Sequence, residues 1–174
     1  MNKSIITLKP LCADDKEQFI LDNQWAFKYG ATAAFGVDQI GTDEEIISRK
    51  TIEHSMNELG SETYRIMLDD KPVGGMILQI NNETHHNFLD ILFINPNMHG
   101  KDIGYRAWLE AEKLHPETEI WETCTPYFEK RNIHFYVNKC GFQIDQFWCA
   151  FFQPEHSESD EGSDEMFRFI KIMQ

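Results

Sequence analysis

The feature that most constrains the fold is a nearly continuous apolar run at Phe88 to Ile94, which reads FLDILFI. A strand that is apolar at successive positions, rather than at alternate ones, is typical of a sheet covered on both faces. Pro96 follows and predicts the end of the strand, because proline cannot donate a hydrogen bond to a sheet. A helical pattern then spans Gly100 to Leu114. The chain is therefore predicted to hold a buried strand that leads through a short glycine-bearing turn into a helix.

The other elements follow from local patterns. Further strands are predicted at 4–8, 63–68, 73–80, 119–124, 142–152 and 166–173, and further helices at 13–27, 42–59 and 128–140. The segment 29–41 shows no periodicity and is predicted to be a loop. Thr42 and Glu45 have the spacing of a capping box, which predicts that a helix begins there. This order of elements predicts a mixed α/β fold, with hairpins in the first half and βαβ-like connections in the second.

Composition limits the class of protein. The 174 residues, 41% of them hydrophobic and 13% aromatic, suit one packed domain over residues 1–174. No apolar run reaches the roughly 18 residues of a membrane span, and the first residues lack the pattern of a secretory signal. The four cysteines lack metal-ligand spacing and are expected to be free thiols of a reducing compartment. We therefore expect a cytoplasmic protein with no metal site and no membrane attachment.

The net charge narrows the partners. A formal charge of −13 argues against nucleic acid, whose phosphates require a basic surface. The same charge favours a cationic small substrate, although an acidic surface that only serves solubility explains it equally well. The aromatic strands near the C-terminus can form either a homodimer interface or a core, so both readings stay open.

The turn after the buried strand has the composition of an anion site. The first amides of a helix have no partner inside the helix, and the helix dipole is positive at that end. Gly100 and Gly104 allow the backbone to approach a phosphate closely, and Lys101 adds positive charge. An ordinary strand-to-helix connection explains the glycines just as simply. The GxGxxG fingerprint of dinucleotide-binding proteins and the GxxxxGK[ST] phosphate loop are both absent from the sequence, so a phosphate site here is of another kind.

This turn resembles a motif of the GNAT acetyltransferase superfamily. In that family a strand and a proline are followed by a loop of the form Arg/Gln-x-x-Gly-x-Gly/Ala, which opens a helix and cradles the pyrophosphate of acetyl-CoA. Here His99, Asp102 and Gly104 occupy these three positions.

A second motif strengthens the resemblance. The family ends its next helix with Tyr-x-Lys-x-Gly-Phe, and this chain has Tyr136, Lys139 and then Gly141-Phe142, with one more residue between tyrosine and lysine. The predicted order of elements is also similar to the family's order over nearly the whole chain. The resemblance implies a central mixed, largely antiparallel sheet of about seven strands, flanked by about four helices.

The resemblance further implies acetyl-CoA as the co-substrate and a set of residues around it. Family members often carry an asparagine at the start of the second helix, whereas Asn132 of this chain lies one turn in. The residues implied to bind acetyl-CoA are Phe93, Ile94, His99, Gly100, Lys101, Asp102, Ile103, Gly104, Tyr105, Asn132 and Phe135.

The implied reaction moves an acetyl group from acetyl-CoA to a primary amine of a small molecule or peptide by direct transfer. It needs a neutral amine, a donor to the carbonyl oxygen and a proton for the departing thiolate. The resemblance implies a backbone amide near Phe93 to Asn95 as the donor and Tyr136 as the acid, because an ordinary tyrosine pKa of about 10 keeps the hydroxyl protonated. Glu122 and Asp90 are candidates to relay the amine's proton through water, or else are structural carboxylates.

A second interpretation stays open. Tyr136 can equally be a core aromatic, and Asp102 places a carboxylate where the family has glycine. The alternative is therefore a module of the same fold that holds CoA, or a protein partner, without turnover.

Overall fold

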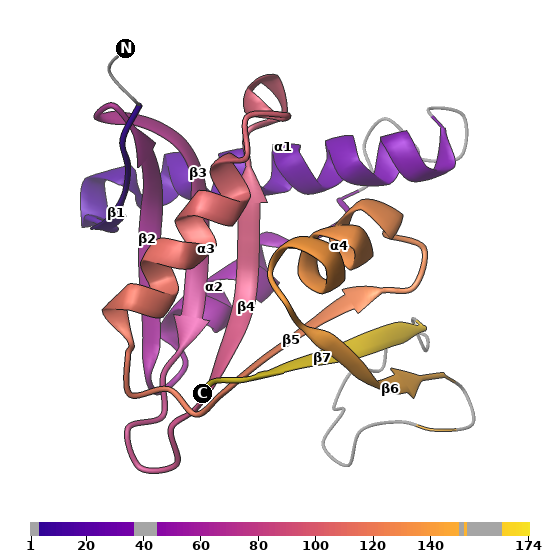
Figure 1. The fold of residues 1–174 in the computed structure, drawn as a ribbon. Helices are drawn as coiled ribbons and strands as arrows, with labels where there is room; N and C mark the ends of the chain where they lie inside the picture. Colours follow the sequence, from indigo (N-terminus) through magenta and orange to yellow (C-terminus); the bar gives the residue numbers. More distant parts are fainter. Residues whose placement is uncertain (1–3, 37–44, 150–151, 153–164) are drawn as a thin grey trace.

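A sheet of seven strands forms the centre of the part of the chain that the structure describes (Figure 1). The computed structural model describes residues 4–36, 45–149, 152 and 165–174. The strands, in sheet order, are β1 (Ile6–Pro10), β2 (Ser61–Leu68), β3 (Lys71–Gln79), β4 (His86–Ile94), β5 (Ile120–Pro126), β7 (Met166–Ile172) and β6 (Gln143–Trp148). Neighbouring strands are antiparallel except β4 and β5, which are parallel. The predicted mixed, largely antiparallel sheet is thus confirmed.

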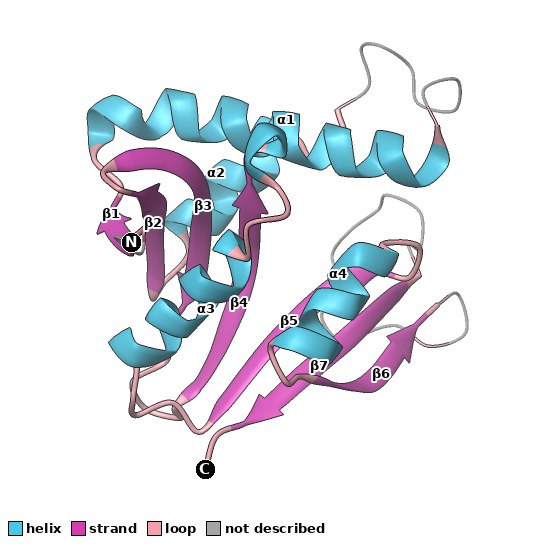
Figure 2. Cartoon of the chain, turned by 45° about the horizontal axis from the view of Figure 1, so that its top comes forward, coloured by secondary structure: helices cyan, strands magenta, loops and turns pink. Residues whose placement is uncertain are grey.

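The two parallel strands diverge along their length. Their pairing joins His86–Phe88 of β4 to Ile120–Glu122 of β5. Beyond these residues the strands separate, and Figure 1 and Figure 2 both show β4 and β5 as the two arms of a V. Thr123 lies at the vertex, where its hydroxyl donates a hydrogen bond to the carbonyl oxygen of Leu89 at 2.8 Å. The sheet therefore opens between its two halves.

Two helices cover one face of the sheet. These are α1 (Lys16–Phe35) and α2 (Arg49–Asn57). Phe19 of α1 and Ile52 of α2 are fully buried in one apolar cluster with Phe93 of β4. The rings of Phe19 and Phe93 meet edge to face with centroids 5.1 Å apart. This packing fixes both helices against the arm of the V that β4 forms.

The other face carries α3 (Ile103–Leu114) and α4 (Lys130–His134). Trp108 of α3 packs edge-on against Trp121 of β5, with ring centroids 5.0 Å apart, and both are fully buried. α3 follows β4 and α4 follows β5, so each arm of the V leads into its own helix (Figure 2). None of the helices that the structure describes is long and apolar enough to cross a membrane.

Several predicted bounds were wrong. α1 continues through Tyr29–Phe35, where a loop was predicted, because the alanines of this segment have the highest helix propensity and sustain a helix without an amphipathic pattern. α2 begins after Ser48, whose side chain accepts a hydrogen bond from the Thr51 amide. The predicted start at Thr42 lies outside the described residues.

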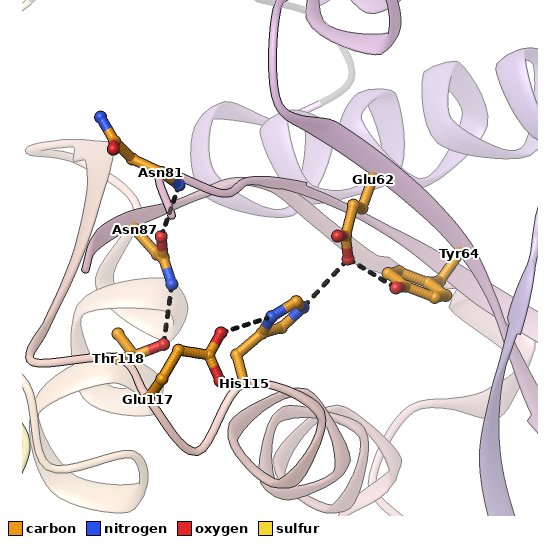
Figure 3. A network of polar contacts seen from close by, with 7 residues as sticks. All are labelled: Glu62, Tyr64, Asn81, Asn87, His115, Glu117 and Thr118. Atoms are coloured by element: carbon orange, nitrogen blue, oxygen red, sulfur yellow. Dashed lines mark hydrogen bonds and ion pairs between the residues drawn. The ribbon is translucent and has the colours of Figure 1, made fainter. Parts of the chain in front are cut away.

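Buried polar contacts hold the base of the V together. Asn87 of β4 is 1% exposed; its Oδ1 accepts from the Asn81 amide at 2.8 Å, and its Nδ2 donates to Thr118 Oγ1 at 2.7 Å (Figure 3). Thr118 lies just before β5. Asn87 therefore ties β4 to the chain that enters β5, at the end where the two strands pair.

A histidine between two carboxylates extends this base network. His115 Nε2 lies 3.0 Å from a Glu62 carboxylate oxygen of β2, and its Nδ1 lies 3.3 Å from Glu117 (Figure 3). Tyr64 donates to the same Glu62 oxygen at 2.6 Å. Burial, together with this hydrogen bond, raises the pKa of Tyr64, so its hydroxyl stays protonated. The network attaches the connection between α3 and β5 to the first hairpin.

Candidate active site between the diverging strands

A cavity of about 1040 Å³ lies where β4 and β5 diverge, and all four α-helices contribute to its lining. The structure brings most of the predicted site residues to this cavity. Those that line it are Asp90, Phe93, Ile94, His99, Gly100, Asp102, Ile103, Gly104, Tyr105, Asn132, Phe135 and Tyr136. Lys101 and Glu122 are not part of the lining. Glu122 instead lies 3.0 Å from the Nε2 of His86 at the base of the V.

Asp90 is the extra residue of a β-bulge. The register between β3 and β4 pairs Leu78 with Leu89 and Ile77 with Ile91, which leaves Asp90 between two paired positions. A bulge turns its side chain away from the regular alternation of a strand. The Asp90 carboxylate accordingly accepts a hydrogen bond from the Ser55 hydroxyl of α2, and both residues line the cavity.

The edge of β4 beyond the vertex presents backbone groups to the cavity. The Asn95 amide donates to a β3 carbonyl oxygen at 2.9 Å, and Phe93 pairs with β3 in the same ladder, so both amides point at β3. In an antiparallel ladder the residue between them points the other way. The Ile94 amide therefore faces the opening toward β5, and the Ile94 carbonyl oxygen lies 3.0 Å from His99 Nε2. Of the predicted amide donors, Ile94 is the one with this geometry.

The turn into α3 exposes the helix N-terminus to the cavity. Gly100 and Asp102 have φ values of +83° and +52°, in the left-handed region. The helix begins at Ile103, later than predicted, and its first amides have no partner inside the helix. Gly104 lies under Phe135: a Cβ at Gly104 would be 3.5 Å from two atoms of that ring. Backbone donors and an aromatic wall therefore meet at this end of the cavity.

The second motif forms an irregular helix. α4 passes at Phe135 into a π-helical turn that ends at Lys139, in which the Cys140 amide donates to the Phe135 carbonyl oxygen at 3.0 Å. A π-helical turn accommodates one more residue than an α-helical turn. This geometry absorbs the additional residue of Tyr136-Val-Asn-Lys139, so the tyrosine keeps an inward position despite the altered spacing.

Tyr136 is nearly buried and lies at the inner wall of the cavity. It is 7% exposed, and its ring contacts those of Phe142 and Phe169 at centroid distances of 5.7 and 5.5 Å. Burial raises the pKa of the Tyr136 hydroxyl above its ordinary value, and a hydrogen bond with Thr123 opposes this only in part. The hydroxyl therefore stays protonated at neutral pH, and it lies beside the residue at the vertex of the V.

Two contacts cross the cavity to the turn before α3, one from α4 and one from its π-helical turn. An Arg131 guanidinium nitrogen lies 3.1 Å from His99 Nδ1. Lys139 forms an ion pair with Asp102. A third contact, from Asn132 Nδ2 to Thr125 Oγ1 at 3.2 Å, holds α4 to β5. The turn before α3 is thus joined across the opening to the helix that carries the second motif.

Sequence reasoning missed many residues of the lining, among them Cys124, Glu129 and Arg131. Burial raises the pKa of the Cys124 thiol to about 12 and also raises the pKa of the Glu129 carboxyl. Arg131 could have been found, because Arg131, Phe135 and Lys139 recur every four residues and hence share a helix face. Neither Cys124 nor Glu129 carries a comparable signal, since their burial depends on α1 and β4, which are distant in sequence.

Comparisons with known proteins agree with this geometry. The model of the Acetyltransferase (GNAT) family matches residues 23–142. The uncharacterized protein YrkN of Bacillus subtilis (strain 168) is 39% identical over 181 residues, which cover 99% of this chain and 96% of that protein. The chain therefore belongs to the GNAT acetyltransferase family.

Solved structures share the fold at low sequence identity. PaiA N-acetyltransferase from Thermoplasma acidophilum, solved with coenzyme A, has a TM-score of 0.65 and 18% identity, covering 97% of this chain and 99% of its own. Spermidine N-acetyltransferase from Vibrio cholerae, solved with CoA and spermine, has a TM-score of 0.67 and 15% identity, covering 96% and 95%. These likenesses concern the fold.

Proposed function

We propose that the protein is an N-acetyltransferase that moves an acetyl group from acetyl-CoA to a primary amine by direct transfer. The observation that carries the proposal is the meeting of three kinds of donor at one cavity: the α3 N-terminal amides, the Ile94 amide and the Tyr136 hydroxyl. A Cβ at Gly100 would have no atom within 4 Å, so a phosphate has room beside the α3 amides. These residues fit the anionic end of acetyl-CoA.

Each donor has a role in the transfer. The amine attacks the thioester carbonyl carbon, so that a C–N bond forms and the C–S bond breaks. The Ile94 amide donates to the carbonyl oxygen as negative charge develops there. The Tyr136 hydroxyl donates a proton to the departing thiolate, and Asp90 accepts the amine's proton through water. Glu122 has no role in this scheme, because it lies outside the cavity lining and pairs with His86.

Direct transfer is favoured over an acyl-enzyme. Cys124 is the thiol that lines the cavity, and a pKa of about 12 keeps it protonated at neutral pH. A protonated thiol is a poor nucleophile. The acetyl group is therefore expected to pass to the amine in one step.

We further propose a cationic acceptor. Asp90, Glu58 and Glu129 line the cavity on the side of α1 and α2, and attract an amine that carries a second positive charge. The fold neighbour from Vibrio cholerae was solved with spermine, a polyamine. The cytoplasmic location and the homodimer stay predictions from sequence. The alternative that the acidic surface only serves solubility also stays open.

Binding and turnover are tested separately. Acetyl-CoA at about 100 times its Kd should stabilise the protein by about 2.7 kcal/mol, which raises Tm by about 8 °C. Thiol release should then depend on the amine and be faster with 1,8-diaminooctane than with octylamine. Asp90→Asn should reduce that preference. The control is thiol release without an amine.

The outcomes separate the two candidate functions. Stabilisation without turnover on any amine would favour the CoA-binding module, for which the carboxylate of Asp102 at the anion site is the supporting observation. No stabilisation at millimolar acetyl-CoA would contradict both functions.

A further inference from the structure

In the turn before α3, His99 and Asp102 line the cavity whereas Lys101 does not, so the lining residues of this turn do not supply the positive charge that a phosphate site needs. Asp102 is negative, and its backbone lies in the left-handed region with φ of +52°. Arginine can only donate hydrogen bonds, so the contact with Arg131 requires an unprotonated Nδ1 on His99. The hydrogen of His99 Nε2 is then directed at the Ile94 carbonyl oxygen. In this arrangement His99 is neutral, and its one N–H group already donates to the Ile94 carbonyl oxygen.

Positive charge instead reaches the turn from the opposite wall. Among the described residues that line the cavity, the arginines and lysines are Arg131 and Lys139. Arg131 contacts His99 at the first position of the motif, and Lys139 contacts Asp102 at the fourth. Phe135 lies between the two cations on the helix and covers Gly104. The two cations therefore flank the α3 N-terminus from across the cavity.

A ligand can replace the side-chain partners of Arg131 and Lys139 at little cost. The side chains of Lys139 and Asp102 are 42% and 61% exposed, and an ion pair in such solvent contact contributes little to folding stability. The Arg131 contact is a hydrogen bond from a cation to a neutral ring, which is weaker than one to an anion. A phosphate that enters the cavity is a better partner for both cations than the side chains they now contact.

We infer that Arg131 and Lys139 are the phosphate-binding cations of this protein, and that Asp102 competes with the phosphates of CoA for Lys139. This inference rests on the cofactor site proposed above. It assigns to α4 and its π-helical turn the charge that the family motif has at position 99 and that the sequence analysis expected from Lys101. It also predicts opposite signs for the two partners of one ion pair: loss of Lys139 weakens CoA binding, and loss of the Asp102 charge strengthens it.

The test is the Kd of CoA, measured by isothermal titration calorimetry for matched variants. Arg131→Gln and Lys139→Gln should each weaken binding at least tenfold. Lys130→Gln is the control, because Lys130 is an exposed neighbour on α4 outside the cavity lining, and it should change Kd less than twofold. Asp102→Asn should tighten binding at least threefold, since asparagine tolerates the left-handed backbone and carries no charge.

The sign of the Asp102→Asn effect guards against misfolding as an explanation, because a damaged protein does not bind more tightly. Weaker binding by Asp102→Asn, or equal effects of Lys130→Gln and Lys139→Gln, would overturn the inference while wild-type binding still stands. Failure of the wild-type protein to bind CoA would overturn the proposed function and the inference with it.

Discussion

The V has a base, where Asn87 joins β4 to the start of β5, and an open end, here called the mouth, where Arg131 and Lys139 face the turn before α3. The base and the mouth are built from different kinds of contact. At the base, Asn87 and Thr118 are buried, and Asn87 forms hydrogen bonds of 2.7 Å with Thr118 and 2.8 Å with the Asn81 amide. At the mouth, the contacts of Arg131 and Lys139 are charged and in reach of solvent. A buried polar group that loses its partner is costly, whereas an exposed ion pair is worth little. The base therefore contributes stability, and the mouth can exchange its partners for a ligand.

Tyr136 and Thr123 lie between these two regions. Thr123 ties β5 to Leu89 at the vertex, and Tyr136 lies next to it, buried on one side and lining the cavity on the other. A rigid base thus holds the proposed acid at the inner end of the open cavity. The comparison predicts that substitutions at the base change folding and that substitutions toward the mouth change function.

The largest expected effect is on turnover. Tyr136→Phe removes the proposed acid and keeps the ring, so kcat should fall about 100-fold, within the range of general acid catalysis. The KM for acetyl-CoA and Tm should change little. Steady-state kinetics and thermal unfolding measure these quantities. A rate equal to that of the wild-type protein would leave Tyr136 as a core aromatic.

Because burial raises the pKa of Tyr136, the wild-type rate should show no loss from Tyr136 ionisation below about pH 10.

The next effect is on stability. Asn87→Ala removes two hydrogen bonds and leaves the Asn81 amide and the Thr118 hydroxyl without that partner, so the free energy of unfolding should fall by about 3 kcal/mol. Asn82→Ala, an exposed residue of the same turn, is the control and should change it by less than about 0.5 kcal/mol. Denaturant unfolding measures both.

The same Asn87→Ala protein tests whether base and mouth are separable. Its Kd for CoA should stay within a factor of two of the wild-type value under conditions where it is folded. If CoA binding weakens as much as folding does, the two regions are coupled, and the comparison fails.

The sequence predicted the fold because its signals are local. The apolar run of β4, the proline after it and the helical pattern of α3 each lie within one segment. The order of strands and helices then follows, and with it the position of the turn at His99–Gly104. The prediction that residues 45–48 are helical was wrong for a local reason as well: Ser48 is a capping residue, and α2 begins after it.

The rest depended on tertiary contacts. The bulge at Asp90 arises from the register of β3 against β4, which a single segment does not encode. The additional residue in the second motif was visible, but its accommodation by a π-helical turn was not. The partners of His99 and Asp102 lie on α4 and on the π-helical turn that follows it, and only the divergence of β4 and β5 brings them across the cavity. The positive charge at this site therefore comes from residues that the fold brings to the turn, and not from the motif in the turn itself.

The smallest expected effect on rate concerns Cys124, which lines the cavity from β5. Under direct transfer, Cys124→Ala should leave kcat within about a factor of two, since cysteine nucleophiles act as thiolates and this thiol is protonated. A loss of tenfold or more would indicate an acyl-cysteine and contradict direct transfer. Iodoacetamide at pH 8 should modify the exposed Cys12 and spare Cys124 in the folded protein.

The pH dependence of stability gives Cys124 a second readout. Its folded pKa of about 12 lies above the ordinary thiol value of about 8.5, so the unfolded chain loses its proton first as pH rises. The wild-type protein should therefore lose stability relative to Cys124→Ala above about pH 8.5, by at most about 1.4 kcal/mol per pH unit, and the difference should be constant below that pH. Denaturant unfolding of both proteins between pH 7 and pH 10 measures it. A constant difference across the whole range would mean that the thiol ionises as readily in the folded protein as in the unfolded chain, and the argument against a nucleophilic Cys124 would then fall.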